Sequence, residues 1–337
     1  MQNNKKDPTI ATIGEFGLIQ SHFAPLCSSK KDIKVGIGDD GTVLSLAPEL
    51  ELVVSTDTLV ENIHFSSSDN PYTLAKKSLR VNLSDLAAMG ATPSWYLLNI
   101  ATPPTTPIAW IKEFACGLKD DGERYAITLT GGDTTSSKGG LVITITVMGQ
   151  VAKNRALLRS GAEPGDRIYL SGTIGDSALG LAYHLGKLQI DNPEDAAYLL
   201  NRHMLPEPRV DLGLQLVEAG IGCGAIDISD GLRADLQHIC TASKVGAEVD
   251  FEKIPLSAAA KRQIEHYGDE VIKQIITGGE DYELLFTYGG DVEKIATIAQ
   301  RVGVAVTDIG VITAGEGVDI NRGGEPVELG FGGWTHF

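Results

Sequence analysis

Carboxylate side chains recur at turn-like positions along the chain, and they are the first indication of chemistry in this sequence. Most of them follow a short apolar run and lie beside glycine, serine or threonine. Carboxylates gathered in one site repel each other unless cations hold them, and a ligand set of oxygens alone selects hard ions such as Mg²⁺. Taken together, six segments indicate such a site: Asp39-Asp40, Asp57, Asp85, Asp133, Asp227 with Asp230, and Glu280-Asp281.

Each of these carboxylates also has an ordinary interpretation, as a turn residue or a helix N-cap. For Asp230, which directly precedes an expected helix, the N-cap is the better interpretation when that residue is taken alone. Asp85 is the strongest case for a site. It follows Ser78 and Asn82 at i, i+4 and i+7 of a helical segment, and these short polar groups suit a site, whereas a solvated face usually shows Lys and Glu. An ordinary exposed stripe is the alternative.

Several other chemistries are disfavoured by the motifs. The sequence contains no G-x-x-x-x-G-K-[ST] phosphate loop and no G-x-S-x-G nucleophile elbow. The seven histidines show no zinc-ligand spacing. Gly172–Gly175 opens a helix after a strand and could hold phosphate on helix amides, but a tight strand-to-helix turn explains it equally well.

Composition narrows the classes of partner. The chain has 337 residues, 28 Lys and Arg, 44 Asp and Glu, and a formal net charge of −16. Such an acidic chain is a poor candidate for binding nucleic acid or an anionic membrane through bulk charge. The four cysteines have no short pair spacing, the amino-terminal residues do not resemble a signal peptide, and Leu141–Ala152 is too short to span a bilayer. We therefore expect a reduced, cytoplasmic protein.

Strand-like and helix-like segments alternate without a strict βαβ rhythm, which favours an α+β fold or a mixed sheet. The turn-rich stretch 154–166 marks a domain junction, so we expect domains at 1–154 and 155–337. The expected strands are Lys34–Ile37, Glu51–Val54, Tyr125–Thr130, Leu141–Val151, Arg167–Ser171 and Tyr282–Thr287; the expected helices are Thr73–Met89, Ile108–Leu118, Asp176–Leu185, Glu194–Met204, Arg209–Ala219 and Leu232–Cys240.

An ordered set of short motifs resembles the thiamine-monophosphate kinase family. The resemblance runs from about Gly14 to Phe337, and the motifs follow in the family's order. They are Gly14–Ile19, Gly38–Asp40, Ser55–Leu59, His64-Phe65, Val81–Gly90, Gly131–Thr135, Arg159–Ala162, Ser171–Thr173, Arg202-His203, Asp227–Leu232 and Gly278–Leu284. Each motif alone is modest, but the ordered set is highly specific.

The resemblance implies a fold and an activity. The activity would be transfer of phosphate from ATP to thiamine monophosphate, the last step of thiamine diphosphate biosynthesis. The fold would be α+β, with two domains of the aminoimidazole ribonucleotide synthetase type. The amino-terminal domain, 1–154, would bind ATP and Mg²⁺ and form a β-barrel across a homodimer interface. The carboxy-terminal domain, 155–337, would complete the nucleotide and substrate site.

The same resemblance implies roles for individual residues. Several Mg²⁺ ions would be bound by Asp40, Thr56, Asp57, Asp85, Asp133, Asp227 and Asp230. ATP would contact Gly132, Asp133, Arg159, Ser229 and Trp110, and thiamine monophosphate would contact His64, Glu280 and Trp334. No residue is expected to act as a nucleophile or base, because phosphoryl transfer depends on positioning and charge neutralisation.

Two other functions compete with a thiamine-monophosphate kinase as interpretations of this sequence. A related enzyme of the same superfamily would make an activated phosphate on a purine precursor, selenide or a maturation partner. A selenophosphate synthetase should carry a reactive Cys and Lys in a glycine-rich amino-terminal segment, but residues 1–12 contain neither cysteine nor glycine. A non-catalytic metal- or nucleotide-binding protein would need only some of these carboxylates. An assay of ATP consumption with and without thiamine monophosphate separates the three.

Overall fold

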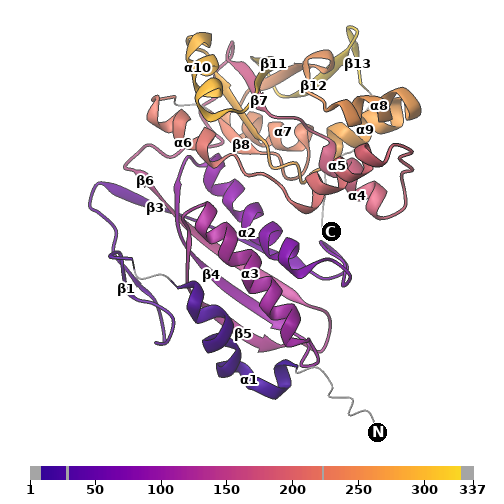
Figure 1. Ribbon diagram of the computed structural model, residues 1–337. Helices are drawn as coiled ribbons and strands as arrows, with labels where there is room; N and C mark the ends of the chain where they lie inside the picture. The colour runs from indigo at the N-terminus through magenta and orange to yellow at the C-terminus, as the bar shows by residue number, and fades with distance from the viewer. Residues whose placement is uncertain (1–8, 28–29, 222–223, 328–337) are drawn as a thin grey trace. The chain divides into compact units, whose positions relative to one another are not determined.

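The chain folds into two compact units, shown in a computed structural model that describes residues 9–27, 30–221 and 224–327 (Figure 1). Unit 1 comprises Met1–Leu86 and Pro93–Lys153, and unit 2 comprises Ala87–Thr92 and Asn154–Phe337. Both units mix helices with strands, so the α+β expectation is confirmed. Within the described ranges, no helix combines the length and apolarity that a membrane crossing would need.

Unit 1 is built on a four-stranded sheet in the order β3-β6-β4-β5. β3 and β6 are antiparallel over their whole length, and β4 and β5 are parallel. The burial pattern of β3 alternates, so successive side chains point to opposite faces, as the period of two requires. The elements of this unit are α1 (Ile10–Leu18), β1 (Ile33–Val35), β2 (Val43–Leu44), β3 (Leu50–Val60), α2 (Pro71–Ala88), β4 (Thr92–Thr102), α3 (Ile108–Arg124), β5 (Thr128–Ser136) and β6 (Val142–Ala152).

Helices α2 and α3 run side by side along this sheet (Figure 1) and are held together in two ways. Gly117 lets them approach closely, since a Cβ there would lie 2.3 Å from the carbonyl oxygen of Tyr72. The buried Arg80 guanidinium donates to both carboxylate oxygens of Asp121, at 2.6 and 3.0 Å. A bidentate pair of this kind is geometrically specific, so it fixes α2 against α3 and thereby positions the residues that α2 carries.

Two strands of unit 1 are longer than the sequence predicts. β3 continues from the expected Glu51–Val54 to Val60, and β5 begins at Thr128 and continues to Ser136. Asp57 and Asp133 therefore lie inside strands, and the prediction of turns at these positions is wrong. The reason is that backbone pairing continues past the end of the apolar run: Asp57 pairs with Ile145, and Asp133 with Asn99.

Unit 2 contains a seven-stranded mixed sheet in the order β13-β12-β9-β11-β7-β10-β8. Neighbours are antiparallel except β9 and β12, which are parallel. Its core includes fully buried side chains from β7, α7 and α9, such as Leu170, Leu236 and Ile275. The elements are β7 (Arg167–Ser171), α4 (Asp176–His184), α5 (Pro193–Met204), α6 (Val210–Glu218), β8 (Ala225–Asp227), α7 (Leu232–Ser243), β9 (Gly246–Asp250), α8 (Ala258–Tyr267), α9 (Asp269–Thr277), β10 (Leu284–Tyr288), α10 (Val292–Val302), β11 (Val306–Thr313), β12 (Gly317–Arg322) and β13 (Glu325–Pro326).

Candidate active site

In unit 1, two polar residues of α2, Asn82 and Asp85, contact β3. The Asn82 side-chain oxygen accepts the backbone N–H of Asp57 at 3.0 Å, and the Ser55 hydroxyl donates to Asp85 at 2.5 Å. Asn82 and Asp85 thus anchor the strand segment that carries Asp57. Ser78, in contrast, is buried and donates to the Leu74 carbonyl of its own helix, so the expected polar stripe is split between two roles.

The two carboxylates of this cluster, Asp57 and Asp85, disfavour each other's negative charge. Burial raises the pKa of Asp57 to about 6, and the Asp85 carboxylate raises it as well. A dication bound here would relieve that repulsion, and carboxylate and amide oxygens are suitable donors for Mg²⁺. The side chains present therefore fit a hard cation.

Thr56 belongs to the other face of β3. It is exposed, and its hydroxyl donates to the carbonyl oxygen of Ile145 at 3.1 Å and lies 3.0 Å from the Thr146 hydroxyl. Because neighbouring residues of a strand point to opposite faces, the side chains of Thr56 and Asp57 do not converge. The family resemblance assigns both residues to Mg²⁺, whereas β3 directs their side chains to opposite faces.

Gly132 and Asp133 lie on β5, which is the opposite edge of the four-stranded sheet from β3. Three strand spacings of about 4.8 Å place these two edges roughly 14 Å apart. Gly132 has φ +145°, and a Cβ there would lie 1.8 Å from the Leu98 carbonyl oxygen, so this close approach of β4 and β5 requires glycine. Asp133 is exposed, opposite Asn99.

The remaining predicted residues of unit 1 are spread along it. Asp40 is exposed, and its N–H donates to the neighbouring Asp39 at 2.9 Å. Trp110 stacks on Phe114 with ring centres 5.2 Å apart. His64 accepts the Val60 N–H on Nδ1 at 3.0 Å, so the neutral ring carries its proton on Nε2.

In unit 2 the predicted residues are more compactly arranged, around the loop that joins β8 to α7. Asp227 ends β8 and is buried. The N–H groups of Ser229, Asp230 and Gly231 all donate to one carboxylate oxygen of Asp235, at 3.1, 3.0 and 3.0 Å. Burial raises the pKa of Asp235 to about 7, and Asp230 raises it as well. Asp235 therefore holds the loop that presents Ser229 and Asp230.

Sequence reasoning missed Asp235. An acidic residue in the first turn of a helix can reach back to the loop before it, as in a capping box, and that signal was available. Among the described residues, Asp230, Asp235 and His238 are the one group of three metal-ligating side chains, each offering an atom within 4.8 Å of the others. Two carboxylates and an imidazole form a donor set that a divalent cation can use.

A second loop, 278–283, lies directly against the first. The Glu280 N–H donates to the Ser229 carbonyl, and the Tyr282 N–H donates to the Ile228 carbonyl, both at 2.9 Å. A Cβ on Gly279 would lie 1.9 Å from the Ser229 carbonyl oxygen, so the two loops meet at a glycine. The structure thus brings together Ser229, Asp230 and Glu280, which the sequence separates by about fifty positions.

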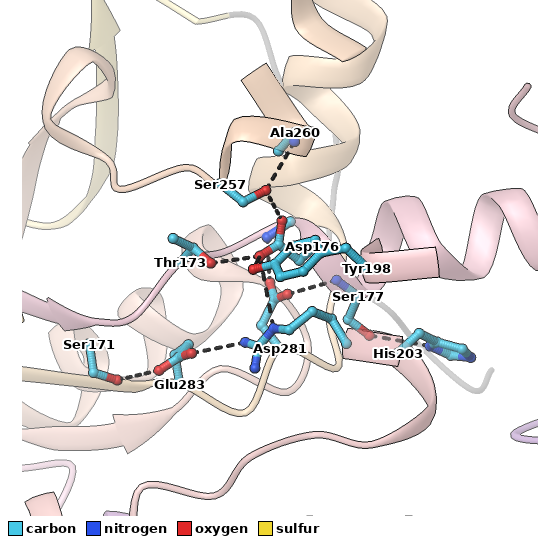
Figure 2. Close-up of polar contacts among 12 residues, drawn as sticks. Ser171, Thr173, Asp176, Ser177, Tyr198, His203, Ser257, Ala260, Asp281 and Glu283 are labelled. Atoms are coloured by element: carbon cyan, nitrogen blue, oxygen red, sulfur yellow. Dashed lines mark hydrogen bonds and ion pairs between the residues drawn. The ribbon is translucent and has the colours of Figure 1, made fainter. Parts of the chain in front are cut away.

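The three carboxylates of the second loop have different surroundings, and Figure 2 shows two of them, Asp281 and Glu283. Asp281 is buried and accepts the N–H groups of Gly175 and Ser177 at 2.6 and 3.0 Å, at the start of α4. Burial raises its pKa to about 8. Glu283 is also buried and accepts from Ser171, Arg202 and Arg209 at 2.5 to 2.9 Å. Only Glu280 keeps an accessible carboxylate, with 26% of its side chain exposed.

Arg159 and Trp334 complete the predicted set. The Arg159 side chain is exposed, and its carbonyl accepts the Ser243 hydroxyl at 3.3 Å. The same hydroxyl accepts the N–H groups of Gly161 and Ala162, so Ser243 holds the Arg159 loop. Trp334 lies outside the described residues.

Comparisons with known proteins show the family of this chain. The family model "AIR synthase related protein, N-terminal domain" matches residues 38–151, and "AIR synthase related protein, C-terminal domain" matches residues 163–322. The chain is 44% identical to the thiamine-monophosphate kinase of Escherichia coli strain K12, over 96% of this chain and 98% of that one.

Two solved structures are similar throughout. The crystal structure of thiamine-monophosphate kinase from Stenotrophomonas maltophilia K279a has a TM-score of 0.82 and 37% identity, and covers 91% of this chain and 96% of its own. AaThiL complexed with AMPPCP and TMP has a TM-score of 0.74 and 34% identity, with 97% and 98% covered. With both domains in order and identity over nearly the whole length, the chain belongs to the thiamine-monophosphate kinase family of AIR synthase related proteins.

Proposed function

We propose that this protein transfers the terminal phosphate of ATP to thiamine monophosphate, giving thiamine diphosphate and ADP. One observation carries the proposal: 44% identity to the E. coli kinase extends over 96% of this chain and 98% of that kinase. The similar structure of AaThiL, which covers 97% of this chain, is a complex with AMPPCP, an ATP analogue, and with TMP. That pair of ligands matches a donor and an acceptor of phosphate.

The proposal assigns roles to the predicted residues. Asp40, Thr56, Asp57, Asp85, Asp133, Asp227 and Asp230 would hold several Mg²⁺ ions, which neutralise the charge of the phosphates. The spread of these residues supports more than one ion, because β3 and β5 are opposite edges of their sheet. Thr56 is the weakest member, because its hydroxyl is directed to β6. Gly132, Ser229 and Trp110 would contact ATP, and Arg159 would grip phosphate oxygens through its planar guanidinium.

On the acceptor side, His64, Glu280 and Trp334 would hold thiamine monophosphate. Because Nδ1 of His64 accepts a backbone N–H, its Nε2–H is the group that could donate to a phosphate oxygen. The Glu280 carboxylate suits the cationic thiazolium ring by charge, and an indole suits it by stacking or a cation–π contact.

The transfer is direct and in line, with no phosphorylated enzyme and no protein base. A phosphate monoester has a second pKa near ~6, so the attacking oxygen of thiamine monophosphate already lacks a proton at neutral pH. The residues of this chain then only bind, orient and exclude water.

We also propose a homodimer in which the sheets of two unit 1 domains complete a β-barrel. β3 is an edge strand, and its outward side chains Leu52 and Val54 are 46% and 55% exposed. An edge strand with apolar side chains on its exposed face favours pairing with a second chain. A cytoplasmic location stays a prediction from the sequence.

The test is ATP consumption by the purified protein with Mg²⁺, with and without thiamine monophosphate, and with an aminoimidazole ribonucleotide precursor as the competing acceptor. We expect turnover only with thiamine monophosphate. Turnover with the precursor alone would instead favour another enzyme of the superfamily. Incubation with γ-labelled ATP and no acceptor should leave the protein unlabelled; label that is trapped on the protein and then chased into thiamine diphosphate at a competent rate would overturn direct transfer.

A further inference from the structure

The loop that carries Glu280 is anchored by hydrogen bonds at several points. Asp281 and Glu283, which both follow Glu280 in the chain, are 1% and 0% exposed, and both anchor the loop to other elements. Asp281 holds the first turn of α4, and Glu283 holds two arginines and Ser171. Glu280 itself has φ +67°, in the left-handed region that non-glycine residues rarely adopt. Such a conformation persists where the surroundings determine it, which is common at functional sites.

The side chain of Glu280 has a partner of its own. Nδ1 of His203, in the last turn of α5, lies 3.3 Å from Oε2 of Glu280 and 3.2 Å from the Ser177 hydroxyl. An ionised carboxylate only accepts hydrogen bonds, so a ring with its proton on Nδ1 is the form of His203 that can donate to Glu280. His203 is 3% exposed, so its side of this contact is shielded from bulk water, where a polar contact is stronger than at the surface.

The position of His203 is fixed by helix packing, and Figure 2 shows its contact with Ser177 of α4. Gly180 on α4 faces α5 so closely that a Cβ there would lie 2.1 Å from the Leu199 carbonyl oxygen and 3.1 Å from Cβ of His203. Ser177, one turn earlier on α4, donates its N–H to Asp281 and meets His203 with its hydroxyl. Ser177 therefore contacts both supports of the loop. Its N–H binds Asp281, which anchors the backbone, and its hydroxyl meets His203, which contacts the accessible Glu280 side chain.

We propose that His203 is a positioning residue for thiamine monophosphate: it fixes the orientation of the Glu280 carboxylate without touching the substrate itself. This inference rests on the proposed function, in which Glu280 contacts the thiamine moiety. A carboxylate held in place before binding loses less side-chain freedom when the ligand arrives, so it binds more tightly. His203 should therefore increase the affinity for thiamine monophosphate, and it should do so only when Glu280 is present.

The experiment compares His203→Asn with His203→Gln. The Asn amide nitrogen can take the place of Nδ1, whereas that of Gln reaches the position of Nε2. We expect His203→Gln to raise KM for thiamine monophosphate about 10-fold, the scale of one hydrogen bond to a charged group, with KM for ATP unchanged. His203→Asn should stay within about 3-fold of the wild type, which is below the energy of one such bond. His203→Leu, if it folds, should behave as His203→Gln.

A double-mutant cycle separates the possible failures. In a Glu280→Gln background, which should itself raise KM for thiamine monophosphate, His203→Gln should add little further effect. Three outcomes would overturn the role of His203 but not the proposed function. They are an equal effect of His203→Gln in both backgrounds, an equal increase in KM for both substrates, and a fully active His203→Gln enzyme. No effect of Glu280→Gln would remove its premise, and no turnover of thiamine monophosphate by the wild type would overturn both this inference and the proposed function.

Discussion

The carboxylates of Asp57 on β3 and Asp85 on α2 disfavour each other's charge across the interface between strand and helix. Burial, and then Asp85, raise the pKa of Asp57 from 3.8 to about 6. Asp57 therefore binds a proton more tightly in the folded than in the unfolded chain. Its favourable contribution to stability is fully present below about pH 3.8 and is lost as the pH rises through about 6.

The first prediction follows from the loss of stability that the ionised Asp57 causes above about pH 6. Without Mg²⁺, Asp57→Asn should increase the free energy of unfolding by roughly 1 kcal/mol at about pH 8, and the gain should disappear near pH 4. Urea denaturation in the presence of a chelator, at both pH values, measures the difference. A gain of the same size at both pH values would show that charge repulsion is not its cause.

The second prediction concerns activity. Asp57→Asn, Asp85→Asn and Asp133→Asn keep the side-chain size but remove a charge that Mg²⁺ needs, so kcat should fall by at least ~10²-fold in each. Asp319→Asn, an exposed carboxylate on β12, is the matched control and should keep full activity. Near-normal activity in all three site variants would contradict the metal assignment.

The third prediction concerns Asp235, which receives three backbone N–H groups from the loop 229–231. Asp235→Ala leaves these donors without their acceptor, and the buried one, the Gly231 N–H, costs about 1–3 kcal/mol when it is unsatisfied. We expect a lower Tm and a higher Mg²⁺ concentration for half-maximal activity. Gln237→Ala, on the same helix, is the control. A lower Tm with an unchanged Mg²⁺ requirement would limit Asp235 to a structural role.

The fourth prediction concerns assembly. Leu52→Lys combined with Val54→Lys places charge on the exposed face of the edge strand β3, and it should convert a dimer to a monomer. Light scattering after size-exclusion chromatography measures the mass. Val292→Lys, an equally exposed apolar residue at the start of α10, should leave the mass unchanged. A dimer that survives the double change would place the interface elsewhere.

The fifth prediction concerns Trp334, which the sequence resemblance assigns to the substrate. If the indole stacks on the thiamine moiety, Trp334→Ala should raise KM for thiamine monophosphate by roughly 5- to 150-fold, on the scale of ~1–3 kcal/mol for a stacking contact. KM for ATP should change little. Lower thermal stability with both KM values unchanged would instead support an anchor for the chain end.

The sequence alone was sufficient for those features that depend on short segments. The ordered motifs identified the family, and this was confirmed by identity over nearly the full chain. Helix ends could also be predicted from nearby residues. Helix α5 (Pro193–Met204) begins after Asn192, whose side chain accepts the Glu194 N–H, and the predicted helix Glu194–Met204 starts one residue later. These signals are local because capping and periodicity involve residues within one or two turns.

Tertiary structure decided which of the carboxylates remain accessible and which residues support them. The adjacent residues Glu280 and Asp281 differ in accessibility. Asp281 is buried against α4, whereas Glu280 contacts His203 and keeps its carboxylate accessible. From the sequence, Asp57 was predicted to lie in a turn. It lies inside β3 because β6 pairs with the strand at this position. These outcomes depend on partners far away in the sequence, and pairing and burial across such separations follow from the packing of the whole domain rather than from local preference.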